Sequence, residues 1–470
     1  MSVNSLMLVL SLTGAASTPQ EQATAILETS GVQGGLIVHV GCGCGDLTAA
    51  LRANDRFLVH GLDASAGNIE AARRHIQSLG VYGPVSVRQW GGSRLPYAEN
   101  LVNLLVVSGE GLVPRDEMLR VLAPGGLALV GNGKVVKPWP KDMDEWTHHL
   151  HGADGNPVAK DRLVGPPARY QWLSEPLWQR CHDTDSSISA IVTASGRIFY
   201  IEDQGPISAV GQHDLPDKWF LVARDAFNGL PLWRQPIEHW GWRQWKKSWF
   251  QSRHGMMPLN LARRLVAVGD SVYVTLGYHA PISQIDAATG RPVQTYQGTE
   301  NAAEILCHAG TLLASVNREG RLKVTALDAK SAALRWETEP AFRGTANEEL
   351  RWGERYGKIE PPKLDPVPNL ATDGRAVCLI DGPELVCLDF QTGNQRWRVQ
   401  PVELPKPKGN PRGAAPNRDL MVGTVIVTEK AVLYADPRQL VSLSTAAYTF
   451  MGSRRRRATC CTKPAWKAHT

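Results

Sequence analysis

The chain has 470 residues, which is more than one hydrophobic core organises and predicts two or three domains. Its formal net charge of +6 comes from the carboxyl-terminal end, because six of the 51 lysines and arginines lie in residues 452–470, which contain no acidic residue. The remaining 45 basic residues balance 45 acidic residues, so the composition gives no electrostatic reason to expect nucleic acid as a partner.

Residues 1–19 combine a short apolar run with a group of small residues. The run at residues 6–12 precedes Gly14-Ala15-Ala16-Ser17, as in a secretory signal, but no Lys or Arg comes before it. We interpret residues 1–19 as a signal or disordered segment, and both an exported and a cytoplasmic location stay open. No stretch approaches the roughly 20 apolar residues of a membrane-spanning helix, so we expect no transmembrane segment.

Residues 20–136 alternate between strand and helix patterns. Apolar runs predict strands at 35–40, 57–62, 85–88, 101–107 and 127–130, and helices at 46–53, 66–79 and 117–121. This alternation is typical of an α/β domain with a doubly wound, Rossmann-like parallel sheet. Ligands of such sheets bind beyond the carboxyl ends of the strands.

A glycine-rich turn follows the first predicted strand, and Asp63 ends the second. Glycines allow the backbone to approach a ligand closely, and a carboxylate can accept both hydroxyls of a ribose. A dinucleotide fingerprint spaces its glycines as Gly-x-Gly-x-x-Gly, whereas here the third glycine comes one residue early and Asp46 disfavours a pyrophosphate. The two cysteines between the glycines are interpreted as small buried residues. The candidate cofactor-binding residues are Gly41, Cys42, Gly43, Gly45 and Asp63; no catalytic residue and no metal ligand is assigned.

Over residues 35–131 this pattern resembles a class I S-adenosylmethionine-dependent methyltransferase. The resemblance is carried by the segment 38–45, by Asp63, by Leu95-Pro96-Tyr97-Ala98-Glu99-Asn100 and by the segment 122–126. It implies that the glycine turn holds the methionine portion of S-adenosylmethionine and that Asp63 holds its ribose.

Three departures from this family stand in the sequence. His39 replaces the usual acidic residue of the first strand, and Gly91 replaces the acid that usually reaches the adenine amino group. No sixth and seventh strands are predicted after Val130, where the family commonly shapes its acceptor site.

Residues 137–188 form a predicted junction. Residues 142–151 hold three histidines and three acidic residues, so His148 with His151, or Asp144 with His148, are candidate metal ligands on one helical face. A polar linker is the favoured interpretation. A second polar cluster follows, and it is interpreted as solvated loop or as the rim of the next domain: Arg180, His182, Asp183 and Asp185.

From residue 189 to 450 a motif recurs four times. Its members are Asp225, Asp286, Asp328 and Asp389; four residues later Gly229, Gly290, Ala332 and Gly393; and eight residues later Trp233, Gln294, Trp336 and Trp397. We expect the Asp to accept backbone hydrogen bonds across a turn, the Gly to supply a positive φ, and the Trp to fill the space between neighbouring sheets. Strand–turn–strand pairs precede the motif, which predicts β-propeller blades.

The repeat resembles quinoprotein-type propellers, as in pyrroloquinoline-quinone-dependent alcohol dehydrogenases and an outer-membrane assembly lipoprotein of the same fold. Residues 221–229 and 385–393 carry the resemblance best. The quinone itself is not expected, because no Ca²⁺ ligands can be assigned and Cys460-Cys461 lies in the basic tail. Four blades and the start of a fifth are predicted, so the propeller is incomplete, and residues 451–470 are a basic disordered tail.

The tryptophans at 240–249 are interpreted mainly as packing residues, with stacking on nucleic-acid bases or sugars as the alternative. We therefore expect an α/β domain fused to an all-β propeller of four to five blades. Two functional hypotheses follow. One is methyl transfer from S-adenosylmethionine to an unknown acceptor; the other is a non-enzymatic scaffold whose propeller binds a protein partner. A quinoprotein dehydrogenase is a third, less favoured hypothesis, and the sequence indicates no oligomeric state.

Overall fold

The computed structural model describes residues 17–165, 170–175, 186–205, 218–241, 244, 260–339, 341–343, 369–382, 384–400, 424–435, 451–454 and 457–458. The chain forms two compact units, Met1–Pro140 and Lys141–Thr470. Within the described residues no helix has the length and apolar character needed to cross a membrane. Residues 1–16 of the predicted signal or disordered segment 1–19, the second junction cluster (Arg180 to Asp185) and the Cys460-Cys461 pair lie outside the described residues. Of the three described residues of that segment, Thr18 caps a helix that begins at Pro19.

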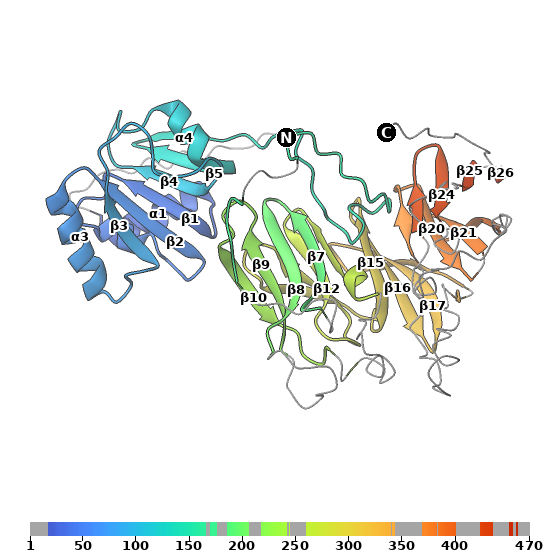
Figure 1. The fold of residues 1–470 in the computed structure, drawn as a ribbon. Helices are drawn as coiled ribbons and strands as arrows, with labels where there is room; N and C mark the ends of the chain where they lie inside the picture. Colours follow the sequence, from blue (N-terminus) through green and yellow to red (C-terminus); the bar gives the residue numbers. More distant parts are fainter. Residues whose placement is uncertain are drawn as a thin grey trace, which may run out of the picture. The chain divides into compact units, whose positions relative to one another are not determined.

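The first unit is built on a six-stranded sheet with the order β3-β2-β1-β4-β5-β6 (Figure 1). The parallel strands are β1 (Gly35–Val40), β2 (Phe57–Asp63), β3 (Val85–Gln89), β4 (Val102–Val107) and β5 (Leu122–Val130). The helices are α1 (Pro19–Ser30), α2 (Asp46–Ala50), α3 (Ala66–Ser78) and α4 (Arg115–Val121). The predicted doubly wound sheet is thereby confirmed.

A sixth strand, β6 (Gly133–Val136), pairs antiparallel with β5. The expectation that no sixth strand follows Val130 is therefore wrong. The strand forms because the chain reverses directly after β5, where Gly131 has a φ of 53°, and its four residues then pair with the sheet edge.

Within its described residues the second unit contains five four-stranded antiparallel sheets, which confirms the propeller-type repeat. We number these blades 1 to 5 in chain order. Their strands are β7 (Ile188–Ala194), β8 (Arg197–Asp203), β9 (Trp219–Asp225) and β10 (Pro231–Pro236); β11 (Leu265–Val268), β12 (Ser271–Thr275), β13 (Ile282–Asp286) and β14 (Pro292–Tyr296); β15 (Ala302–His308), β16 (Thr311–Arg318), β17 (Arg321–Asp328) and β18 (Leu334–Glu337); β19 (Ala371–Thr372), β20 (Ala376–Asp381), β21 (Glu384–Asp389) and β22 (Gln395–Val399); β23 (Thr424–Val427), β24 (Ala431–Ala435), β25 (Met451–Arg454) and β26 (Arg457–Ala458).

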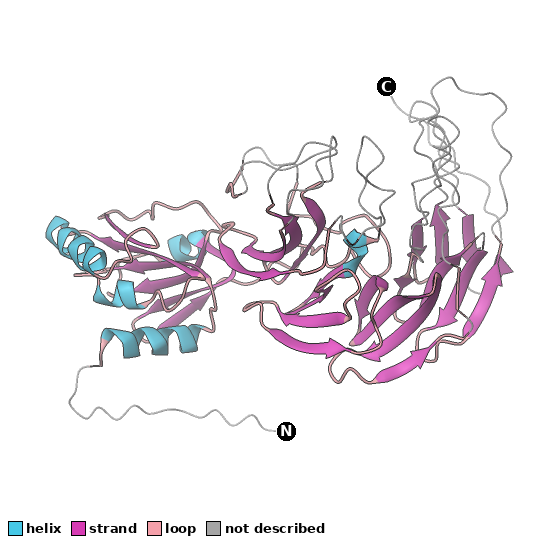
Figure 2. Cartoon of the chain, turned by 90° about the horizontal axis from the view of Figure 1, so that it is seen from below, coloured by secondary structure: helices cyan, strands magenta, loops and turns pink. Residues whose placement is uncertain are grey.

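Hydrophobic clusters lie between consecutive blades, so each blade buries its faces against its neighbours. The sheets follow one another round an arc (Figure 2). The first strands of neighbouring blades contact one another, as β7 contacts β11, β11 contacts β15 and β19 contacts β23, so these strands lie on the inside of the arc. Trp240 lies 4% exposed in the cluster between blades 1 and 2, in agreement with a packing role. The neighbouring Trp242, Trp245 and Trp249 are outside the described residues.

The recurrent motif works as predicted. Asp225 Oδ1 accepts hydrogen bonds from the backbone N–H groups of Phe227 and Asn228 at 2.8 and 3.0 Å. The motif glycines have φ values near 70°. A Cβ added to Gly290 would lie 2.6 Å from Trp233 of the preceding blade, so this position admits only glycine while the indole is there.

The two departures from the motif occur at one blade junction. Gln294 of blade 2 donates to the carbonyl of Ala329 at 2.9 Å, as Trp233 donates to Ala287 one junction earlier. Ala332 in the turn of blade 3 has a φ of 59°. At this junction Gln294, which is smaller than Trp, therefore lies opposite the turn in which Ala332 replaces the motif glycine.

A segment that we call the strap, residues 144–155, crosses the inside of all five blades. One backbone N–H from the first strand of each blade donates to it. The donors and acceptors are Thr193 to Trp146 O (2.7 Å), Ala267 to Thr147 O (3.0 Å), Cys307 to His148 Nε2 (3.1 Å), Thr372 to Ala153 O (2.7 Å) and Val427 to Asp154 O (2.9 Å). Part of the predicted junction is thus integral to the propeller.

Candidate functional site

The glycine loop lies at the carboxyl end of β1, between that strand and α2. Gly41, Gly43 and Gly45 have φ values of 79°, 52° and 91°, which favour glycine. A Cβ on Gly45 would lie 2.9 Å from Cβ of Ala72, so this glycine lets α3 approach the loop. A Cβ on Gly43 would meet nothing within 4 Å, so the space in front of the loop is open.

Asp63 turns toward this loop from the end of β2. Its Oδ2 accepts the Gly43 N–H at 2.9 Å, and its Oδ1 accepts Ser65 N–H at 2.9 Å and Asn68 Nδ2 at 3.0 Å. Partial burial opposes ionisation, but these hydrogen bonds from Ser65 and Gly43 outweigh it and lower the pKa of Asp63. The side chain is therefore a carboxylate at neutral pH, aimed at the glycine loop.

The two cysteines of the loop differ. Cys42 is 5% exposed and packs against β2, and burial raises the pKa of its thiol to about 12. Only the main chain of Cys42, and not its thiol, is therefore available for contact with a ligand. Cys44 is exposed and its Sγ donates to Asp46 at 2.7 Å. The interpretation of both cysteines as buried is thus wrong for Cys44, because the positive φ of Gly43 turns the following residue outward.

His39, which replaces the usual acid, is a buried structural residue. Its Nδ1 lies 2.8 Å from Thr48 Oγ1 and its Nε2 lies 2.7 Å from Ser108 Oγ, so it joins α2 to the loop after β4. Burial lowers its pKa to about 4, although Asp63 acts in the opposite direction. His39 is therefore neutral at physiological pH.

Two further segments border this edge of the sheet, and the sequence reasoning did not single them out. Trp90, directly after β3, donates its backbone N–H to Asp63 O at 2.8 Å. The sequence could have pointed to Trp90, because it precedes Gly91, which stands where the family usually has an acid that reaches the adenine. In the loop after β4, the side chain of Leu112 is 44% exposed and would touch a Cβ on Gly41 at 3.5 Å.

The segment 95–100 is held by an ion pair on α4. Glu117 accepts the Leu95 N–H at 2.6 Å and pairs with Arg120, and Arg120 donates to the carbonyls of Leu95 and Tyr97. The predicted motif thus has a defined, hydrogen-bonded structure ahead of β4.

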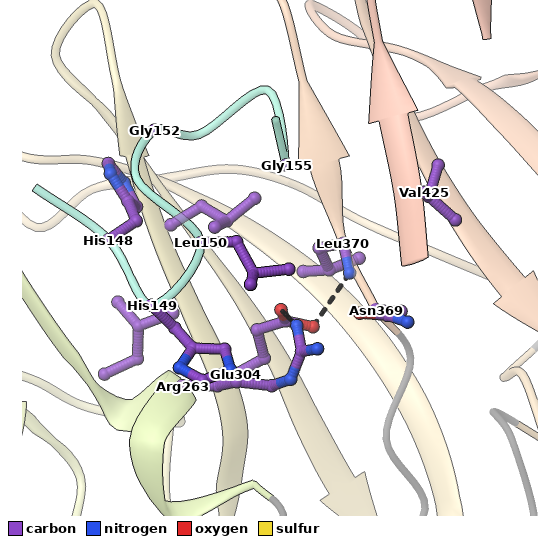
Figure 3. A pocket seen from close by; sticks show the side chains of 12 residues that line it. His148, His149, Leu150, Gly152, Gly155, Arg263, Glu304, Asn369, Leu370 and Val425 are labelled. Carbon is purple, nitrogen blue, oxygen red and sulfur yellow. Dashed lines mark hydrogen bonds and ion pairs between the residues drawn. The ribbon is translucent and has the colours of Figure 1, made fainter. Parts of the chain in front are cut away.

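A second candidate lies inside the propeller, where the strap meets blades 3 to 5 (Figure 3). This small cavity is lined by His149, Arg263, Glu304 and Asn369, among others. Arg263 Nη1 and Glu304 Oε1 form a buried ion pair at 2.5 Å, and Glu304 Oε2 accepts the Leu370 N–H at 2.8 Å. Burial, with a contribution from Arg263, lowers the pKa of His149 to about 4.

The histidines of the strap have structural contacts. His148 Nε2 accepts the Cys307 N–H, so its proton is on Nδ1, 2.7 Å from Thr147 Oγ1. His151 Nε2 lies 2.7 Å from Asp144 Oδ2. Both ring nitrogens of His148 and Nε2 of His151 are thus engaged in other contacts, and the described residues contain no group of three or more His, Cys, Asp or Glu suited to a metal ion.

Comparisons with known proteins agree with this division. A family model described as "Methyltransferase domain" matches residues 37–126, and one described as "Outer membrane protein assembly factor BamB" matches residues 174–407. The chain is therefore a fusion of a methyltransferase-type domain with a quinoprotein-type β-propeller repeat.

Individual relatives are named as methyltransferases or methyltransferase-like proteins. The ubiquinone/menaquinone biosynthesis C-methyltransferase UbiE of Klebsiella pneumoniae subsp. pneumoniae is 27% identical over 181 residues, covering 36% of this chain and 69% of the relative. Methyltransferase-like protein 27 of Homo sapiens is 36% identical over 97 residues, covering 20% of this chain and 38% of the relative. A solved geranyl diphosphate C-methyltransferase from Streptomyces coelicolor A3(2), in complex with S-adenosyl-L-homocysteine, is 21% identical with a TM-score of 0.22, covering 23% of this chain and 41% of that chain. The chain thus spans less than half the length of the last two proteins.

Proposed function

We propose that the first unit binds S-adenosylmethionine at the carboxyl ends of β1, β2 and β4 and transfers its methyl group to an acceptor. The observation that carries this proposal is the Asp63 carboxylate, which is ionised and accepts the N–H of Gly43, a residue whose Cβ position is open. A carboxylate offers roughly four lone-pair directions, and three hydrogen bonds from the protein leave capacity for a ribose hydroxyl.

The residues present fit such a cofactor. The main chain of Gly41, Cys42, Gly43 and Gly45 would hold the methionine portion, and Asp63 would hold the ribose. The bound sulfonium supplies an electrophilic methyl group, and the protein contributes by holding the acceptor in line with it. The exposed Leu112 and the loop after β4 border the side from which an acceptor would approach.

Calorimetric titration of the full chain with S-adenosylmethionine tests this proposal. We expect Asp63→Asn to weaken binding at least tenfold, about 1.4 kcal/mol, because the amide cannot accept the same set of hydrogen bonds. Asp55→Asn is the matched control, since Asp55 is an exposed acid paired only with Arg52. No binding at millimolar cofactor, or equal binding by both variants, would exclude the proposed site.

A non-enzymatic scaffold is the second candidate function, and the edge of the sheet favours it. The sheet ends at the four-residue β6, and from Lys137 the chain runs on toward the propeller. Measuring S-adenosylhomocysteine release with quinone precursors, the acceptor class in the name of the UbiE relative, separates the two. Cofactor binding without release supports the scaffold.

A further inference from the structure

The cavity between the strap and blades 3 to 5 has the size of a water site (Figure 3). About 20 Å³ of it is open to the centre of a water molecule, and about 10–15 Å³ by this measure accommodates one water. Apolar cavities of this size stay dry, whereas polar ones take up water that bonds to buried polar groups. The polar atoms of the wall therefore decide what the cavity holds.

Asn369 brings a buried amide to this wall. The residue lies just ahead of β19 and is 2% exposed, and its Nδ2 has no hydrogen-bond partner among the described residues. The terminal torsion of Asn is broad, so the amide can turn either its nitrogen or its oxygen to the cavity. A buried amide without a partner is costly, so Asn369 points to a small polar ligand.

Glu304 has acceptor capacity beyond its contacts with the protein. Its oxygens accept Arg263 Nη1 and the N–H of Leu370, and a carboxylate offers roughly four lone-pair directions, so about two remain. The pair with Arg263 balances the charge of Glu304. His149 on the same wall is neutral at neutral pH, because burial lowers its pKa to about 4. The cavity thus favours a neutral ligand that can donate hydrogen bonds.

Val425 contributes a second acceptor from the first strand of blade 5. Its carbonyl oxygen lies so near Gly155 of the strap that an added Cβ on Gly155 would overlap it. Val427, two residues further along β23, directs its N–H to the strap carbonyl of Asp154. Residues two apart in a strand direct their backbone groups to the same edge, so the Val425 carbonyl also faces the strap. Val425 lines the cavity at this point.

We propose that the cavity binds one resident water molecule, which hydrogen-bonds to the amide of Asn369 and donates to Glu304 or to the carbonyl of Val425. A water both donates and accepts, is neutral and fits the volume, and about three bonds to the protein are usual for a buried water. This ligand joins the start of blade 4 to blade 3 or blade 5, beside the strap.

Diffraction from crystals of the full chain at high resolution tests the proposal directly. We expect an isolated density peak in the cavity, roughly 2.7–3.2 Å from the amide of Asn369 and from Glu304 or the Val425 carbonyl. A cavity without density, or a peak that does not contact Asn369, overturns the proposal. A peak only about 2.0–2.6 Å from the oxygen atoms identifies a metal ion instead and also overturns it.

Oxygen-17 relaxation dispersion, which detects long-lived internal waters, tests the site in solution. Asn369→Leu keeps a similar side-chain volume and removes the polar atoms, so we expect the loss of one long-lived water. Asn301→Leu is the matched control: Asn301 also precedes the first strand of a blade, with φ 62° against 54° for Asn369, but it contacts the exposed His279 and does not line the cavity. An unchanged signal in Asn369→Leu, or the same loss in Asn301→Leu, overturns the proposal. If Asn369→Leu does not fold, the density in the wild-type crystal decides.

Discussion

The backbone N–H of Gly43 donates to the carboxylate of Asp63 at 2.9 Å. This bond ties the glycine loop after β1 to the end of β2, although the two residues are 20 positions apart in the chain. The two predicted parts of the cofactor site are thus a single hydrogen-bonded unit before any ligand enters. Substitutions at either part are expected to affect both.

The glycines of the loop are expected to separate binding from stability. Gly43→Ala adds a methyl group to open space, so it costs about 1–2 kcal/mol of left-handed strain and lowers affinity for S-adenosylmethionine at least tenfold. Gly45→Ala places its methyl 2.9 Å from Ala72 and is expected to cost about 2 kcal/mol more in the free energy of unfolding. Urea unfolding and calorimetric titration check both. Equal loss of stability in the two variants would contradict the assigned roles.

The propeller is expected to lose stability as the pH falls below about 6.5. Burial, with a contribution from His308, lowers the pKa of His148 to about 3. Between these values the unfolded state binds a proton that the folded state excludes, so unfolding becomes easier by about 1.4 kcal/mol per pH unit for this residue. His148→Gln keeps an acceptor for Cys307 and is expected to flatten the slope between pH 5 and 6.5. The exposed His279→Gln is the control, and an unchanged slope in His148→Gln would refute this account.

The buried ion pair of the propeller cavity gives a third prediction. Glu304→Gln leaves Arg263 charged without its partner, and Arg263 is only 8% exposed. We expect a loss of about 3 kcal/mol in the free energy of unfolding. The double variant Arg263→Met with Glu304→Leu is expected to lose less, because it removes both charges. A double variant less stable than Glu304→Gln would argue against charge burial as the cause.

The junction between blades 3 and 4 tests the Gly–Trp contact. Gly393→Ala places a methyl 2.5 Å from Cε3 of Trp336, and we expect a cost of about 2 kcal/mol or more. In a Trp336→Gln background the same substitution is expected to cost about 1 kcal/mol, the strain of a positive φ alone. Gly382→Ala is the control, since its φ is 59° and nothing lies within 4 Å. A cost independent of residue 336 would mean that the contact is incidental.

Much of the fold could be predicted because its signals are local. The apolar run of β1, with all six residues buried, indicated a central strand, and the regular Asp–Gly–Trp spacing indicated blades. Helix α1 was missed although Thr18 and Glu21 form a capping box with Pro19 at its start, because residues 1–19 were interpreted as a signal or disordered segment, which placed the capping residue Thr18 outside the folded domain. Strand β6 was missed because four edge residues carry no periodicity.

The remaining features depend on contacts between distant residues. No local pattern shows that the carbonyl of Ala153 meets the N–H of Thr372, or that His148 meets Cys307. The cofactor site itself stays a prediction, supported by the orientation of Asp63.

The strap precedes every blade in the chain, so it leaves the ribosome before any blade has been synthesised. For each blade that follows, the strap already provides a carbonyl or imidazole acceptor for one N–H of the blade's first strand. The blades can thus assemble in the order in which they are translated, each one pairing with the strap that has already been synthesised. The strap also links blades that are not neighbours. Unfolding of blade 1 is therefore expected to destabilise blade 5, and the reverse.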